Sequence, residues 1–126
     1  MIDWKSNPFF DEKEFQCKCG CGRVDMDLIF IDRLTRARKL AQIPFYITSG
    51  FRCPEHNQKV TTSNNSPHLY GVAADIRAGN SRDRFIIIDS ALKAGFKRIG
   101  IGALFVHLDI HQDEHKTQNV IWTYYD

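Results

Sequence analysis

The chain has 126 residues, of which 43% are apolar and 25% charged, and its formal net charge is +2. That length suits one domain with one hydrophobic core, and the ordinary apolar content argues against extensive disorder. Neither the mild charge nor the spread of Lys and Arg indicates a nucleic-acid-binding surface. No apolar run approaches the roughly 20 residues needed to cross a bilayer. We therefore expect one domain over residues 1–126, monomeric, with no nucleic-acid or membrane partner.

The N-terminus bears on where the chain acts. Residues 1–5 show neither the apolar run nor the small-residue cleavage site of a secretory signal. We expect synthesis in the cytoplasm without a signal peptide. Action at a cell wall would then need another route, such as release during phage lysis.

The first part of the chain predicts a loop followed by an amphipathic helix. Residues 1–24 are expected to form loop with one helical turn, with aromatic side chains covering an edge of the core. Residues 26–41 predict a helix that Asp25 or Asp27 can cap. Its apolar positions recur near helical spacing, and they are Leu28, Ile31, Leu34 and Leu40, with Ala37 and Ala41 filling in.

The remainder alternates short strands with helices. We predict strands at 45–48, 72–76, 97–101, 104–111 and 120–124, and helices at 54–60 and 81–94. Ser81 is the expected cap of the second of these helices, and Gly95 its stop. A polar loop fills 61–67. This order favours an α+β fold: a single domain with a mainly antiparallel sheet and flanking helices.

The strand at 104–111 carries the clearest pattern. Its apolar residues Leu104, Val106, Leu108 and Ile110 fall on one face, and Phe105, His107, Asp109 and His111 fall on the other. Because strand side chains alternate between faces, one face should join the core and the other should present three ionisable groups in a row.

Three side chains form a candidate metal site. Catalytic zinc sites use three protein ligands, drawn from imidazole, thiolate and carboxylate, plus one water. His68 and Asp75 are seven residues apart, a spacing that suits a loop residue and a strand residue joined by a turn at Gly71. His107 would supply the third ligand from the neighbouring strand. By spacing alone, histidines in ordinary polar positions remain the alternative.

Four segments, in the same order, resemble a known family. Residues 66–75 (SPHLYGVAAD) resemble the Ser-x-His-x-x-Gly-x-Ala-x-Asp signature of zinc D-Ala-D-Ala carboxypeptidases and phage L-Ala-D-Glu endopeptidases. Residues 105–109 (FVHLD) and 48–57 (TSGFRCPEHN) are similar to two further segments of this group. The cysteine-rich stretch at 15–22 is similar to the opening of its short members. The resemblance covers about residues 15–124.

The resemblance implies a hedgehog/D-Ala-D-Ala-peptidase type of fold and one Zn²⁺ held by His68, Asp75 and His107. It also implies that Arg52 faces the substrate, where its fork of donors suits a carboxylate or an oxyanion. A structural ion pair is the alternative role for Arg52.

The general base does not follow the pattern of the relatives. Several relatives place an acid three residues before the last ligand, and others a His two residues before it. These positions hold Leu104 and Phe105 here. Asp109 and His111 lie on the correct strand face and are our candidates for assisting water activation. Alternatively, Asp109 orients a ligand imidazole through a hydrogen bond. His111 could instead be a solvent-exposed residue with no role in catalysis.

The cysteines allow three interpretations. Cys17, Cys19 and Cys21 are too closely spaced for a usual zinc ribbon, although with Cys53 they make a possible four-thiolate site. A disulfide from Cys53 to one of the others is the second interpretation. Reduced, partly buried thiols are the third, and the one that the expected cytoplasmic origin favours.

The sequence thus supports a zinc metallopeptidase that hydrolyses peptidoglycan stem peptides, as a D-Ala-D-Ala carboxypeptidase or an L-Ala-D-Glu endopeptidase. Its partner would be a peptidoglycan peptide. The missing base keeps open a second hypothesis, a zinc-binding structural or wall-binding module, for example of a phage particle. A small cysteine–zinc nucleic-acid module is a third hypothesis, which the modest charge and the cysteine spacing disfavour.

Overall fold

A computed structural model describes residues 1–113 and 115–124 of the chain. Its elements, in chain order, are two short 3₁₀ helices (Trp4–Ser6 and Glu12–Phe15), α1 (Leu28–Ala41), β1 (Ile47–Ser49), α2 (Pro54–Val60), a 3₁₀ turn (Pro67–Tyr70), β2 (Ala73–Arg77), α3 (Ser81–Lys93), β3 (Arg98–Ile101), β4 (Phe105–Asp109) and β5 (Val120–Thr123). Every helix and strand expected from the sequence is present, with ends shifted by a few residues. None of the described helices is long and apolar enough to cross a membrane.

The strands form one sheet in the order β1-β2-β4-β3-β5. The pairs β1·β2, β2·β4 and β3·β4 are antiparallel, and β5 joins the edge parallel to β3. Strands β3 and β4 are consecutive in the chain and make a hairpin. The α+β class with a mainly antiparallel sheet is therefore confirmed.

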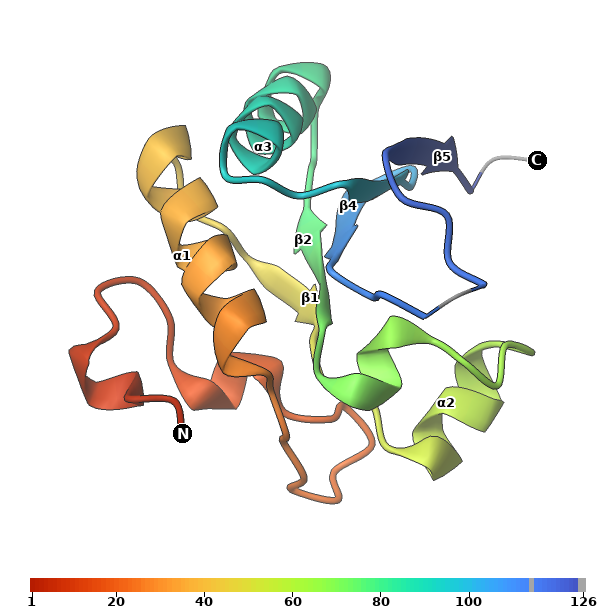
Figure 1. Cartoon of the computed structure of the whole chain (residues 1–126). Helices are drawn as coiled ribbons and strands as arrows, with labels where there is room; N and C mark the ends of the chain where they lie inside the picture. The colour runs from red at the N-terminus through yellow and green to blue at the C-terminus, as the bar shows by residue number, and fades with distance from the viewer. Residues whose placement is uncertain (114, 125–126) are drawn as a thin grey trace.

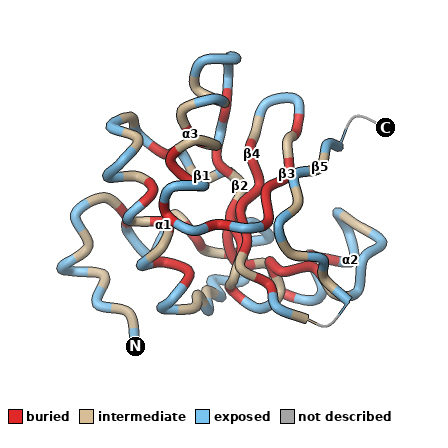
Figure 2. Tube along the Cα trace, turned by 45° about the horizontal axis from the view of Figure 1, so that its top comes forward, coloured by how far each residue is buried: buried red, intermediate tan, exposed pale blue. Residues whose placement is uncertain are grey.

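Helices α1 and α3 lie side by side and cover one face of the sheet (Figure 1). The core fills the space between them and the strands, where the buried segments of the chain gather (Figure 2). Phe30 of α1 meets Phe96, just after α3, edge to face at 5.9 Å between ring centroids. The opposite face of the sheet is not covered by these two helices, and α2 lies beyond its lower end in Figure 1.

The helix ends follow local hydrogen-bonding rules. The carboxylate of Asp27 accepts a hydrogen bond from the backbone N–H of Phe30 and caps α1, as one of the two predicted alternatives. Helix α3 is capped by Asn80 rather than by the predicted Ser81, which is the first helical residue. Gly95, with φ of 97°, follows the last turn of α3 and ends it, as expected.

Three predicted core positions are wrong. The buried face of α1 consists of Phe30, Ile31, Leu34 and Ala37, whereas Leu28 and Leu40 are exposed. The helix starts two residues later than expected, and Phe30 takes the core position in its first turn. Leu104 does not point into the core either: it lies in the turn between β3 and β4 and is 64% exposed, because β4 begins only at Phe105.

Gly71 makes the turn that the sequence predicted between His68 and Asp75. Its φ is 69°, and a Cβ at this position would lie 1.9 Å from the backbone oxygen of Asp25. The chain therefore needs glycine here both for backbone conformation and for close approach to the segment before α1.

We expect Gly71→Ala to destabilise the fold by about 2 to 4 kcal/mol, from left-handed backbone strain and overpacking together. Urea unfolding measures this change. Gly79→Ala is the matched control, because a Cβ at Gly79 meets nothing within 4 Å. Equal stability of the two variants would contradict the role given to Gly71.

Candidate metal centre

The three predicted ligands converge at one point of the sheet's open face. His68 lies in the 3₁₀ turn, and Asp75 and His107 are directly opposite each other on β2 and β4. Opposed residues of an antiparallel pair project to the same side of the sheet, so this register brings the two side chains together. One ring nitrogen of each histidine and one oxygen of Asp75 all lie within 4.8 Å of one another.

The distances fit a zinc ion. Nδ1 of His107 lies 2.8 Å from Oδ1 of Asp75, and Nε2 of His68 lies 3.4 Å from the same oxygen. Bonds of about 2.0–2.1 Å around a tetrahedral zinc ion place neighbouring ligand atoms roughly 3.3 Å apart. Two imidazoles and one carboxylate are also the donor set of a hydrolytic zinc site.

The other nitrogen of each imidazole is already engaged. Nδ1 of His68 is 2.7 Å from the carbonyl oxygen of Gly50, to which it must donate because a carbonyl can only accept. Nε2 of His107 is 2.7 Å from Oδ2 of Asp109. These bonds set the tautomer and orientation of each ring and turn its lone pair toward the shared point, as outer partners of metal-bound histidines do.

The local electrostatics leave His107 between two acids. Burial alone lowers the pKa of His107, but hydrogen bonds to Asp109 and Asp75 outweigh it and raise the pKa to about 9. For Asp75 burial acts in the opposite direction and raises the pKa. The hydrogen bonds from His107 and His68 outweigh this effect and hold the pKa of Asp75 well below its usual range. Without a metal, a proton on His107 balances the negative charge of these carboxylates.

Asp109 is fully buried and has both oxygens occupied. Besides the bond to His107, its Oδ1 accepts from Nε of Arg98 at 2.7 Å and from the backbone N–H of His111 at 3.0 Å. Of the two roles that the sequence left open for Asp109, this geometry favours the orienting one. Arg98 itself was missed by the sequence reasoning, although a charged residue inside a predicted core strand, opposite Asp109 in the register, was a usable signal.

Arg52 faces the same cleft from the segment that leads into α2. Its Nη1 donates to Oδ1 of Asn57 at 3.1 Å, and its Nη2 lies 3.4 Å from Oγ of Ser49. Burial lowers the pKa of Arg52, while the charge of Asp75 opposes that shift. Both terminal nitrogens of Arg52 thus have a polar partner, and the side chain lines the cleft beside the three candidate ligands.

The cleft beside the three ligands has a volume of about 520 Å³. Two further cations, Arg98 and Lys116, line it, together with an aromatic wall of Phe105, Trp122 and Tyr124. The guanidinium of Arg98 stacks on the Trp122 ring at 4.9 Å. Sequence reasoning identified the last strand but missed these roles, because nothing in residues 120–124 shows that β5 pairs with β3 and flanks the site.

His111 is the predicted site residue that the structure does not bring to the cleft. Strand β4 ends at Asp109, and the ring of His111 packs on Tyr70 with centroids 5.3 Å apart. Its ring is buried and is not among the cleft-lining residues. Alternation along the strand placed His111 beside His107, but the regular strand ends before it reaches that residue.

Comparison with known families supports the identity of this site. The family model described as peptidase M15 matches residues 8–109 and so includes all three ligands. The chain belongs to the peptidase M15 family. No curated protein matches it. Membership of this family places the chain in the class of zinc metallopeptidases. A zinc ion bound at such a site would polarise a substrate carbonyl and lower the pKa of a water ligand to about 7.

We expect Asp109→Asn to weaken zinc binding about 10- to 100-fold, because His107 loses the acceptor that orients it. The variant should also lose about 3 to 5 kcal/mol of stability, since the buried Arg98 loses its ionic partner. Competition with a chromophoric chelator and urea unfolding measure the two effects. Asp89→Asn, which removes an exposed helix pair with Lys93, is the control and should change neither. Full zinc affinity with lost turnover would instead show that Asp109 acts on the reaction directly.

Zinc affinity should rise about tenfold per pH unit between pH 7 and about 9, because zinc must displace the proton of His107. The stability of the metal-free protein should instead fall as pH rises. The raised pKa makes His107 stabilising below its unfolded value of about 6.5, and that contribution is lost as pH rises toward 9. Calorimetric zinc titrations and thermal unfolding at several pH values test both trends, and a pH-independent affinity would contradict them.

Proposed function

We propose that this M15 domain hydrolyses peptide bonds in peptidoglycan stem peptides, using zinc held by His68, Asp75 and His107. The observation that carries the proposal is the position of Arg52, which lines the same cleft as the three ligands. An anionic group of a substrate held by Arg52 would place a neighbouring peptide bond close to the metal. Stem peptides carry such groups, as the C-terminal D-Ala carboxylate and the free carboxylate of D-Glu.

The charge of the cleft supports an anionic peptide. Arg52, Arg98 and Lys116 line it, and among the described residues its carboxylates are Asp75 and Asp109 alone. Asp75 belongs to the ligand set and Asp109 is bound to His107 and Arg98. The cleft therefore presents net positive charge to a ligand, and it disfavours cationic peptides.

Tyr124 supplies a hydrogen-bond donor on the far wall of the cleft. A phenol is protonated at neutral pH, and partial burial raises the pKa of Tyr124 further. Its ring centroid lies 6.5 Å from that of His107. A protonated phenol at this position suits stabilisation of the negative charge that develops on a substrate oxygen. Arg52 would bind the carboxylate, and Tyr124 would face the reacting carbonyl.

A carboxypeptidase and an endopeptidase would use this cleft differently. In the first, Arg52 binds the terminal carboxylate of D-Ala, and in the second it binds the carboxylate of D-Glu. Both uses satisfy the bidentate geometry of a guanidinium. The mass of the released product distinguishes them, because one reaction frees D-Ala and the other leaves a new amine on D-Glu.

One observation favours a second candidate function, a zinc-binding wall or virion module with weak turnover. Over residues 1–113 and 115–124, the cleft has no carboxylate that is both unbound and outside the ligand set. The two positions where relatives place a base hold the exposed Leu104 and the cleft-lining Phe105. Such a module would bind zinc and peptidoglycan without cleaving it.

Digestion of purified peptidoglycan by the zinc-loaded protein tests the proposal. We expect new amine or free D-Ala in the wild-type reaction, and none with His68→Ala, which loses a ligand. Arg52→Ala should retain zinc but lower kcat/KM about 10- to 100-fold, through loss of a charge-assisted hydrogen bond of about 1.5–3 kcal/mol. Arg82→Ala, on the exposed side of α3, is the matched control.

Zinc content and peptidoglycan pull-down, measured on the same samples, separate the two candidates. Zinc and peptidoglycan binding without product would establish the second candidate. Product formation that is unchanged in His68→Ala would contradict both.

A further inference from the structure

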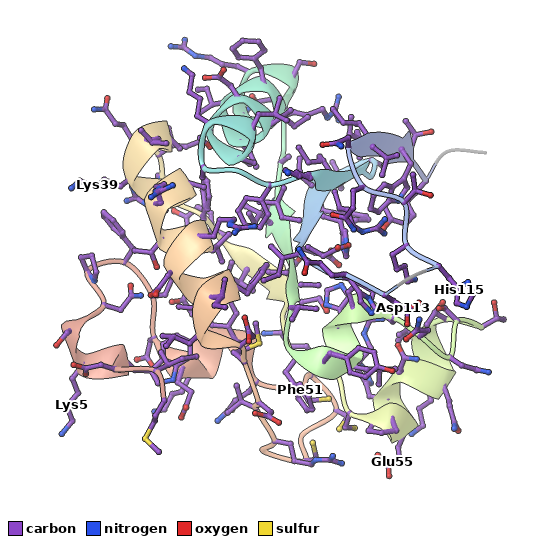
Figure 3. The ribbon with its side chains drawn as sticks, in the orientation of Figure 1. Lys5, Lys39, Phe51, Glu55, Asp113 and His115 are labelled. Carbon is purple, nitrogen blue, oxygen red and sulfur yellow. The ribbon has the colours of Figure 1, made fainter. Side chains whose placement is uncertain are left out.

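A second group of metal-ligating side chains lies apart from the cleft. The sulfur atoms of Cys17, Cys19, Cys21 and Cys53 all lie within 4.8 Å of one another. Three of them come from the loop after the second 3₁₀ helix, and Cys53 is the residue that caps α2. None lines the cleft of the first site. Figure 3 shows sulfur atoms beside the labelled Phe51, at the start of α2.

The spacing of the sulfurs is that of a tetrahedral metal site. The distances Cys17–Cys19, Cys17–Cys53 and Cys19–Cys53 are 3.5, 3.6 and 3.6 Å. Zinc–sulfur bonds of about 2.3 Å place the sulfurs of a tetrahedral site roughly 3.8 Å apart. A disulfide would draw two sulfurs to about 2.05 Å and leave the others aside. Three nearly equal separations point to one common centre rather than to a pair.

Backbone donors already face these sulfurs. The N–H of Cys53 donates to Sγ of Cys17 at 3.3 Å, the N–H of Arg23 to Sγ of Cys21 at 3.4 Å, and the N–H of His56 to Sγ of Cys53 at 3.4 Å. Such bonds stabilise a thiolate more than a thiol, because an ionised acceptor makes the stronger hydrogen bond. Three of the four sulfurs therefore have the outer partner expected of a metal ligand.

Few contacts besides the cysteines order the loop that carries three of them, and its ion pair between Arg23 and Glu55, at 3.5 Å, is exposed. Residues 18–23 are all exposed, so burial of apolar side chains does not fix their conformation. Gly20 and Gly22 adopt φ of 89° and 76°, and the N–H of Cys17 donates to the carbonyl of Arg23, which folds the loop back on itself. Fixing each residue of such a loop costs about 1–2 kcal/mol of backbone entropy. Metal binding is a common source of the compensating free energy.

The deep side of the cluster is apolar. Cys17 and Cys53 are buried and pack with Phe51, while Val24 and Met26 cover the group from the segment before α1. Cys19 and Cys21 face solvent. The cluster thus has a closed, hydrophobic side that limits water access and an open side through which an ion can enter.

We propose that Cys17, Cys19, Cys21 and Cys53 bind a second zinc ion, in a four-thiolate structural site that fastens the N-terminal loop to the start of α2. On binding, the four thiols release four protons and no redox step is involved. Four protein ligands leave no open position for water, so this site is structural and not hydrolytic. Soft thiolates select zinc over the hard ions Mg²⁺ and Ca²⁺.

The site would also brace the hydrolytic centre. Residues 50–53 connect the two groups, because the carbonyl of Gly50 accepts from His68 and the side chain of Cys53 joins the sulfur cluster. Arg52 lies between them, and its N–H donates to the carbonyl of His68 at 3.1 Å. Fixing Cys53 therefore limits the movement of both Arg52 and the residue that orients a ligand imidazole.

Metal content and cobalt spectra of the whole chain test the proposal. The protein is prepared under reducing, oxygen-free conditions, and His68→Ala removes the first site. We expect wild type to bind two zinc ions and His68→Ala to bind one. Cobalt added to metal-free His68→Ala should give intense sulfur-to-metal charge-transfer absorption, which requires thiolate ligands. The band should lose intensity when Cys21→Ala is added, because one of the four thiolates is removed, and should keep its intensity with Lys18→Ala, the matched change in the same exposed loop.

A measurement without cysteine variants guards against misfolding. Zinc added to the metal-free wild-type protein should protect all four thiols from alkylation, as counted by mass, and excess chelator should restore their reactivity. The inference is overturned if cobalt gives no thiolate band, if His68→Ala binds no metal, or if the thiols react equally with and without zinc. It is also overturned if the mass shows a disulfide under these conditions. None of these readouts depends on peptidoglycan cleavage, so the two proposals can fail separately.

Discussion

The site depends on one cross-strand pairing, the register that sets Asp75 on β2 directly opposite His107 on β4. A slip of one residue would turn one of the two side chains to the helix-covered face and leave His68 with a single partner. The register is held by the core, because Ala74, Ile76, Val106 and Leu108 alternate with the two ligands and are fully buried under α1 and α3. The apolar pattern of two short strands thus positions the candidate metal ligands.

Around this pair, acidic and basic side chains alternate along one chain of hydrogen bonds. His107 lies between the carboxylates of Asp75 and Asp109, and Asp109 in turn binds Arg98. A buried Asp109 without Arg98 would compete more strongly for the proton of His107 and would oppose metal binding. With Arg98 in place, Asp109 can orient the imidazole while its charge stays paired. The same arginine stacks on Trp122. Arg98 therefore contacts both the aromatic wall of the cleft and the carboxylate that orients His107.

Local patterns predicted most of the fold, and the resemblance to a known family predicted the three candidate ligands that the structure brings together. Helix α1 and the strands follow from periodicity, and the turn at Gly71 from its position between His68 and Asp75. What the sequence reasoning missed depends on contacts between distant segments. Arg98 and Tyr124 enter the cleft through the pairing of β3 with β4 and β5, which no local pattern specifies. The errors at Leu104 and His111 have a different cause: alternation was extended beyond both ends of a strand that spans only 105–109.

The cysteines show how spacing along a chain can mislead when the ligands come from two segments. Three cysteines separated by single residues do not resemble a zinc ribbon, in which each pair shares one turn. The fourth ligand, however, arrives from the start of α2, 32 residues after Cys21 in sequence. Its placement depends on the N–H of Phe51, which donates to the carbonyl of Phe15, so the aromatic core beneath the loop brings the two segments together. The same residues 50–53 lie against His68 and carry Arg52. In a chain this small, one short segment therefore links the N-terminal loop, the substrate-facing arginine and the orientation of a metal ligand.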